Sequence, residues 1–135
     1  MATTTATISI NSADIMSGQV INLTKSSNLN QAETTTGLVN TTGLAIRTLK
    51  ATSAEVLVDY SVVLNDDDEM GAKMYIKNNG TSSSQFVTIT INSVEICRLY
   101  GGDFAFFPYP NDDDRDITAT PSTTEEVTIE YMAIF

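Results

Sequence analysis

Residues 86–108 read FVTITINSVEICRLYGGDFAFFP, and this stretch decides the fold class. Its first six residues alternate apolar side chains with threonines, which is typical of a strand with one buried face and one wet face. Asn92 and Ser93 predict a turn, and residues 94–100 predict the next strand. The stretch therefore indicates antiparallel β-structure.

A second turn is predicted at Gly101 and Gly102. A Gly-Gly pair supplies the positive φ angles that a two-residue hairpin turn requires. Residues 104–108 then predict a third strand. We therefore expect a three-stranded antiparallel meander in which at least one of the two glycines has a positive φ.

The same alternation appears on both sides of this stretch. Residues 127–135 alternate apolar and polar side chains up to the last residue, which predicts a strand that is tied into a sheet. Further strands are predicted at residues 8–10, 20–23, 44–49, 56–64 and 74–77. Eight or nine short strands with polar turns predict an all-β fold, a single antiparallel β-sandwich of jelly-roll or related topology.

The length of 135 residues suits one domain, which we predict over residues 1–135. Residues 25–42 are rich in Ser, Thr and Asn and hold few large apolar side chains. Two interpretations fit them: a long surface loop, and an arm that becomes ordered only against a neighbouring subunit. The threonine-rich residues 1–7 are predicted to form an extended N-terminal arm.

Charge and composition bear on partners and on compartment. Seven basic and seventeen acidic residues give a net charge of −10, which repels the phosphates of nucleic acids and anionic lipids. No apolar run approaches the ~20 residues of a membrane span, and the N-terminus lacks the features of a secretory signal. The one cysteine excludes an internal disulfide, which suits a reducing cytosol. We expect no nucleic-acid partner and no membrane partner.

The side chains offer little catalytic chemistry. The chain has no histidine, so a Ser-His-Asp or Cys-His site cannot be built within it. Cys97 is predicted to be a small buried hydrophobe. A reactive thiol would need a cationic neighbour to lower its pKa, but Arg98 beside it points to the other face of the strand. The acidic runs at residues 66–69 and 112–114, with Asp116, are interpreted as solvated turns or, alternatively, as ligands of Ca²⁺. We expect no enzyme, and no catalytic, cofactor-binding or metal-binding residues.

Four segments of the C-terminal half resemble a class of small virion proteins of tailed phages, notably phages of marine and cyanobacterial hosts. The segments are MYIKN at residues 74–78, FVTI at 86–89, RLYGGDFAFFP at 98–108 and VTIEY at 127–131. The class has tryptophan after the proline, where this chain has Tyr109. These motifs form strands and turns and carry no catalytic group.

The resemblance implies a capsid decoration protein, also called a cement protein, that binds the outer surface of a phage head and stabilises it. Its implied partners are further copies of itself, as a homotrimer, and the lattice of the major capsid protein. It would be made and assembled in the cytoplasm of the host bacterium and reside on the capsid surface of the virion. Acidic charge agrees with the outside of a shell, and many weakly bound copies gain avidity on a lattice.

Two other functions compete with this interpretation. A receptor-binding or glycan-binding module of a tail fibre or attachment knob predicts that Tyr100, Phe107 and Tyr109 are exposed near one end of the sandwich; the alternative for these aromatics is packing in the core. A carboxylate-based hydrolase would need two carboxylates that face each other across a cleft, for instance from Asp66 and Asp112. The sequence indicates no such cleft.

Overall fold

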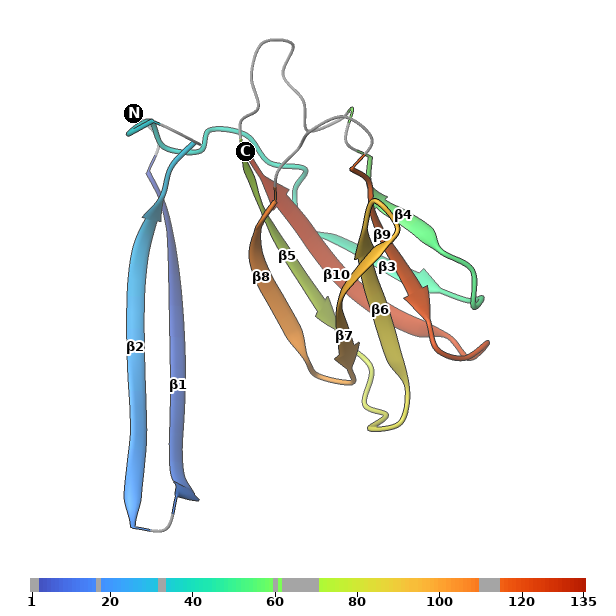
Figure 1. Cartoon of the computed structure of the whole chain (residues 1–135), viewed down its shortest axis with the longest axis horizontal. Coiled ribbons are helices and arrows are strands. Elements are labelled where there is room, and N and C mark those ends of the chain that lie inside the picture. Colours follow the sequence, from blue (N-terminus) through green and yellow to red (C-terminus); the bar gives the residue numbers. More distant parts are fainter. Residues whose placement is uncertain (1–2, 17, 32–33, 60, 62–70, 110–114) are drawn as a thin grey trace. The chain divides into compact units, whose positions relative to one another are not determined.

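The computed structural model describes residues 3–16, 18–31, 34–59, 61, 71–109 and 115–135. The chain forms two compact units, Met1–Val39 and Asn40–Phe135, and each is described by itself. Ten antiparallel strands make up the described part of the chain (Figure 1). The predicted all-β class is confirmed, with ten strands where eight or nine were expected.

The first unit is a two-stranded antiparallel ribbon. β1 (Thr4–Met16) pairs with β2 (Gln19–Leu29), and the register places Thr4 opposite Leu29. Gly18, in the turn between the two strands, has a φ of 79°, a conformation that residues with a Cβ adopt at a cost. We call residues 4–29 the ribbon.

The ribbon bears on two predicted segments. Residues 4–7, part of the predicted extended N-terminal arm, are extended and paired in β1. Residues 25–29, predicted as loop or arm, form the end of β2. Thr and Ser side chains suit the wet face of a strand, but their polarity hid the pairing, which the partner strand fixes. In residues 30–39, as far as they are described, only the bridge between Asn30 and Gly37 continues the pairing.

The second unit consists of two four-stranded sheets. The first has the order β3-β10-β5-β8, with β3 (Ala45–Leu49), β10 (Val127–Ile134), β5 (Ala72–Asn78) and β8 (Phe104–Tyr109). The second has the order β4-β9-β6-β7, with β4 (Glu55–Val58), β9 (Ile117–Pro121), β6 (Phe86–Ile91) and β7 (Val94–Tyr100). We call them sheet I and sheet II.

The pairing of these strands is that of a long hairpin rolled into a barrel. β3 pairs with β10, β4 with β9, β5 with β8 and β6 with β7, and the roll closes where β10 meets β5 and β9 meets β6. This is the strand order of an eight-stranded jelly roll. The predicted sandwich of jelly-roll type is confirmed (Figure 1).

One hydrophobic core lies between the two sheets. It takes side chains from all eight strands, namely Leu49, Leu57, Val58, Ala72, Met74, Ile76, Val87, Ile89, Leu99, Tyr109, Ile117, Ala119, Val127, Ile129 and Ala133. The alternation read from the sequence is confirmed at β6, where Val87 and Ile89 are fully buried while Thr88 and Thr90 lie on the outer face. The core cluster takes no residue from the ribbon.

The turn at Asn92 and Ser93 is confirmed, but the meander beyond it is wrong. Both turn residues have positive φ angles, 47° and 63°, and β6 and β7 form a hairpin. β8, however, pairs with β5 in sheet I and not with β7. The chain therefore crosses from one sheet to the other at Gly101 and Gly102.

The two glycines serve this crossing in different ways. Gly102 has a φ of 90°, which confirms the predicted positive φ. Gly101 has an ordinary φ, but a Cβ there would lie 2.7 Å from the carbonyl oxygens of Gly80 and Ser82. Its N–H donates to the Ser82 oxygen at 3.2 Å. The glycine pair thus permits close passage of two backbone segments, which sequence alone does not distinguish from a hairpin.

Asn78 holds the same corner together from inside. Its side chain is buried, and its Nδ2 donates to the backbone oxygen of Leu99 at 2.9 Å. Its Oδ1 accepts the N–H of Gly80 at 2.8 Å. Because Leu99 belongs to sheet II and Asn78 to sheet I, this amide links the two sheets at the crossing.

Three further strands can be compared with the prediction. β9 was not predicted, because its sequence ITATP is short and ends in a proline, which removes a ladder donor. β4 ends at Val58, whereas the prediction ran to residue 64; of that continuation, residues 60 and 62–64 lie outside the described residues. The strand predicted at 44–49 is confirmed as β3.

Candidate interaction surface

The ribbon has two chemically different faces. In an antiparallel pair, residues directly opposite each other point to the same side. One face, which we call the apolar face, carries the aliphatic residues Ala6, Ile8, Ile10, Ile21, Leu23 and Leu29 together with Thr4, Ser12, Lys25 and Ser27. The other, the polar face, carries Thr5, Thr7, Ser9, Asn11, Asn22, Thr24, Ser26 and Asn28. Both sets follow from the register and from the alternation along each strand.

The polar face is a ladder of cross-strand hydrogen bonds. The hydroxyls of Thr7 and Ser26 lie 2.7 Å apart, and the Thr5 hydroxyl donates to Asn28 Oδ1 at 3.2 Å. These pairs hold the strands in register and leave the remaining lone pairs and donors in water. The polar face is therefore suited to solvent.

The apolar face is the more informative one because its aliphatic side chains are exposed. Ile8, Ile10 and Leu23 keep 46%, 52% and 39% of their surface accessible. A two-stranded ribbon has no second layer of its own, so it is marginally stable in water without a partner. Adjacent exposed aliphatics of this kind mark interaction sites in soluble proteins. We take the apolar face as the candidate functional site.

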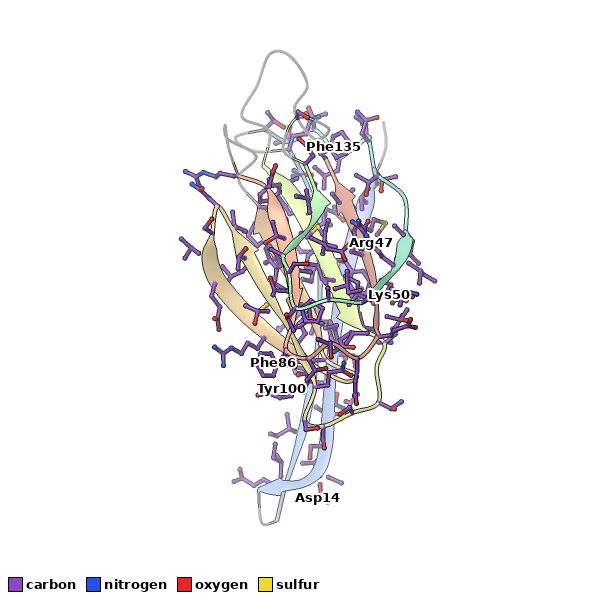
Figure 2. All side chains as sticks on the ribbon, turned by 90° about the vertical axis from the view of Figure 1, so that its right-hand side faces the viewer. Asp14, Arg47, Lys50, Phe86, Tyr100 and Phe135 are labelled. Atoms are coloured by element: carbon purple, nitrogen blue, oxygen red, sulfur yellow. The ribbon has the colours of Figure 1, made fainter. Side chains whose placement is uncertain are left out.

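The ribbon carries little charge and no net charge. Residues 4–29 contain one acidic residue, Asp14, and one basic residue, Lys25, which lies opposite Ile8. Residues 40–135 contain six basic and fifteen acidic residues and so carry a net charge of −9. Figure 2 shows the labelled Asp14 at the turn end of the ribbon. A partner of the apolar face meets little electrostatic repulsion from the ribbon itself.

The outer face of sheet I carries a half-buried row of large side chains. Tyr75 of β5 lies opposite Met132 of β10 on one side and opposite Phe106 of β8 on the other. At the edge strands the face ends in more exposed residues, Ile46 and Phe104. This surface is a second apolar region, although its central side chains cover one another.

A hydrogen-bonded carboxylate orders that row. The Tyr75 hydroxyl donates to Glu130 Oε1 at 2.6 Å, and Asn79 Nδ2 donates to Glu130 Oε2 at 3.1 Å. Burial, followed by the bond to the Glu130 carboxylate, raises the pKa of Tyr75 to about 12. The bonds from Tyr75 and Asn79 lower the pKa of Glu130. At neutral pH the pair is a neutral phenol that donates a hydrogen bond to a carboxylate, and this bond holds the two side chains in place.

The outer face of sheet II is dominated by threonine. Thr90 and Thr118 lie opposite each other with their hydroxyl oxygens 2.6 Å apart, and Thr88 lies opposite Thr120. At one end the rings of Phe86 and Tyr100 contact each other, with centroids 5.2 Å apart (Figure 2). The Arg98 guanidinium lies over the Phe86 ring at 5.0 Å and binds Glu95.

The three aromatics proposed for receptor binding do not form an exposed cluster. Tyr109 is fully buried, and its hydroxyl donates to the backbone oxygen of Arg115. Phe107 is half-buried and packs against the core. Tyr100 alone is exposed, with 39% of its surface accessible. The alternative interpretation, packing in the core, is correct for Tyr109 and Phe107.

Cys97 behaves as a small apolar side chain. It packs against the core cluster, although it is half-buried and not buried as predicted. Burial, and to a lesser degree the charge of Glu95, raises the pKa of its thiol. The neutral thiol is therefore favoured over the nucleophilic thiolate.

The acidic runs at residues 66–69 and 112–114 lie outside the described residues. In the described part of the chain, no three Asp, Glu, Cys or His side chains group closely enough to hold a metal ion. No helix within the described ranges is long and apolar enough to cross a membrane.

A shallow hollow of about 300 Å³ opens beside the strands β3 and β4. Its lining is mainly apolar and consists of Thr42, Ala45, Val56, Leu57, Val58, Asp59 and Tyr131. Among the described lining residues Asp59 is the one carboxylate, and it accepts hydrogen bonds from the hydroxyl and the backbone N–H of Ser61, which lower its pKa. The acidic run at residues 66–69, which follows Asp59 in the chain, lies outside the described residues.

The ribbon was only partly visible in the sequence. The prediction placed short strands at residues 8–10 and 20–23, which are the aliphatic centres of β1 and β2. The full ribbon could have been recognised from the alternation that continues into the Thr- and Ser-rich residues on both sides of these centres, if the two segments had been interpreted as one hairpin.

Compared with known proteins, the sequence matches no protein-family model and no curated protein.

Proposed function

We propose that this chain is a virion structural protein, a capsid decoration or cement protein that binds the outer surface of a phage head and stabilises it. The observation that carries the proposal is the exposed apolar face of the ribbon, which gains stability in water when it is covered and so suits a chain that works within an assembly. The resemblance of residues 74–131 to small virion proteins of tailed phages supports the same assignment.

The architecture fits this role in three respects. The jelly roll supplies a body whose core is formed by apolar side chains from all eight of its strands. The net charge of −9 on residues 40–135 keeps that body away from packaged DNA and suits the outer side of a shell. Repeated weak contacts on the lattice of the major capsid protein add up to firm attachment. The proposal involves no catalysis.

The test is binding to phage heads that lack this protein. Purified protein is mixed with expanded heads and cosedimented over a range of protein concentrations. We expect saturable binding at a fixed ratio to the major capsid protein, together with a higher temperature of head disruption. Absence of binding to heads at every concentration would contradict the proposal.

The second candidate, a receptor-binding or glycan-binding module of a tail fibre or knob, is favoured by one observation. Tyr100 is exposed beside Phe86 on the outer face of sheet II, and an exposed aromatic ring can stack on a sugar. Reproducible hits on a glycan array that are lost on Tyr100→Ala would favour adhesion. A blank array together with binding to heads would favour decoration.

A further inference from the structure

We infer that the apolar face of the ribbon packs against the same face in other copies of this chain, so that the ribbons form the contact through which the protein self-associates. The inference deepens the proposed function and rests on its self-assembly. It assigns that assembly to residues 4–29 and to one of their two faces.

The first step concerns the need for a partner. The polar face satisfies its side chains by hydrogen bonds within the ribbon, for example between Ser9 and Thr24 at 3.3 Å. The apolar face has no such internal solution, because aliphatic side chains gain only by leaving water. Ile10 and Leu23 lie directly opposite each other at its centre and are both exposed. Covering this face is therefore what stabilises the ribbon.

The second step concerns charge. Two bodies that each carry a net charge of −9 repel each other, and the repulsion extends over roughly 8–10 Å at physiological salt. The ribbon holds only Asp14 and Lys25 as charged residues. Contact through the ribbon thus joins copies at a part of the chain that has no net charge, with Lys25 as the one charged residue among the paired rows of the apolar face. An acidic body is a poor surface for self-association, and the apolar face is a good one.

The third step concerns complementarity. The apolar face presents aliphatic side chains along one side, with the hydroxyl residues Ser12 and Ser27 among them and with Lys25 opposite Ile8. An aliphatic surface of the same width can pack against this face and exclude water from it, and another ribbon provides such a surface. In a symmetric oligomer the same patch serves both partners, so no second specialised surface is required.

The size of the face limits how strong the contact is. Nine paired rows, from Thr4 opposite Leu29 to Ser12 opposite Ile21, span roughly 30 Å at about 3.3 Å per row. With two strands this gives on the order of 300 Å² per face, whereas a stable interface buries about 800 Å² per partner. Two ribbons alone are therefore a weak pair. The self-association is therefore expected to depend on the protein concentration.

The experiment places the same pair of charges on either face of the full-length chain. Ile10→Lys with Leu23→Lys charges the apolar face, whereas Ser9→Lys with Thr24→Lys charges the polar face one residue away. Sedimentation velocity is run on wild type and both variants over a wide range of concentrations. We expect the wild type and the polar-face variant to form the same oligomer, and the apolar-face variant to need at least about tenfold more protein, a change of ~1.4 kcal/mol.

A cysteine pair tests the contact without adding charge. In a Cys97→Ser background, Ile10→Cys should form a disulfide between copies under mild oxidation, because equivalent side chains on the apolar face approach one another. The matched control, Asn11→Cys, points to the polar face and should remain mostly reduced. Bridging requires Cβ atoms about 3.5–4.5 Å apart, so the comparison reports proximity directly.

The outcomes separate this inference from the proposed function. Equal self-association of the two lysine variants, or equal disulfide yields at residues 10 and 11, would overturn the inference. The same holds if the wild type is a monomer at every concentration and Ile10→Cys gives no dimer, which would assign the face to another partner such as the capsid lattice. Cosedimentation with heads is measured for the same variants, so that failure of self-association and failure of head binding are seen independently.

Discussion

The ribbon and the jelly roll are built from the same alternating pattern, yet they bury it very differently. Val87 and Ile89 in β6 are fully buried, whereas Ile8 and Ile10 in β1 keep 46% and 52% of their surface exposed. Alternation gives a strand one apolar face, but only a second layer removes that face from water. The jelly roll contains its second layer, whereas the ribbon by itself has only one.

This difference has an energetic scale. Full burial of an isoleucine side chain stabilises a protein by about 1.5–3 kcal/mol relative to its exposed state. Each half-exposed aliphatic of the ribbon therefore leaves a substantial part of that stabilisation unused. A contact that covers the apolar face recovers it, which gives the ribbon a thermodynamic reason to associate.

The largest expected effect comes from a matched truncation in the two regions. Ile89→Ala should lower the unfolding free energy of the sandwich by about 2–4 kcal/mol, because it leaves a cavity in the core between the sheets. Ile10→Ala should change that free energy by less than about 0.5 kcal/mol, since the core takes no residue from the ribbon. Urea denaturation followed by circular dichroism measures both. Equal losses would mean that the ribbon shares the core of the sandwich.

The next effect compares glycines of the two regions. Gly101→Val should destabilise the sandwich by roughly 1–3 kcal/mol or more, because its Cβ would meet two backbone oxygens at 2.7 Å that cannot move aside easily. Gly18→Ala should cost only about 1 kcal/mol, from the strain of its positive φ, since no atom lies within 4 Å of the added Cβ. Thermal unfolding of both variants distinguishes the crossing from an ordinary turn. Unchanged melting of Gly101→Val would show that the close backbone approach is absent.

Two asparagines give a smaller contrast. Asn78→Ala removes a buried amide and leaves the Leu99 oxygen and the Gly80 N–H without their partner, so we expect a loss of about 1–3 kcal/mol. Asn28→Ala, on the exposed polar face of the ribbon, should stay within about 0.5 kcal/mol. Chemical denaturation of both variants, with the native chain as reference, is the measurement. A neutral Asn78→Ala would mean that water replaces the amide at the crossing.

The smallest effect is a pH dependence that only the sandwich should show. Burial and the bond to Glu130 raise the pKa of Tyr75 to about 12, above the value of about 10 for an unfolded tyrosine. The folded state therefore binds this proton more tightly, so the contribution is fully present below pH 10 and is lost as the pH rises toward 12. Stability measured across this range should fall less steeply in Tyr75→Phe than in the native chain. If the stability curves of Tyr75→Phe and of the native chain ran parallel over this pH range, Tyr75 would not be the cause of the pH dependence. Tyr100→Phe is the control variant.

Much of the fold could be predicted because local pattern is strong in its centre. The alternation in β6 and β10, and the turn at Asn92 and Ser93, are local properties of a few residues each. β9 could not be predicted in this way, because its five residues gain strand character only from pairing with β4 and β6. The ribbon was found only at its aliphatic centres for the same reason, since its Thr- and Ser-rich ends depend on register.

The candidate site was less predictable than the fold. The absence of histidine, which excludes a Ser-His-Asp or Cys-His site within the chain, is visible in the sequence. The sequence left two interpretations open for Tyr109, exposure in a binding site and packing in the core, and the structure shows the second. Whether an aromatic side chain faces solvent or core depends on which strand covers it, and that is decided by pairing between distant segments.

The amino-acid sequence by itself determined that this chain forms antiparallel strands, that it is strongly acidic, and that its outer faces carry threonine. These are properties of single residues and of their nearest neighbours. Only the tertiary structure decided that Gly101 and Gly102 carry the chain from one sheet to the other, and that residues 4–29 form a ribbon with one uncovered face. The physical reason is that a strand satisfies its backbone and its apolar side through partners remote in sequence, and local pattern does not name those partners.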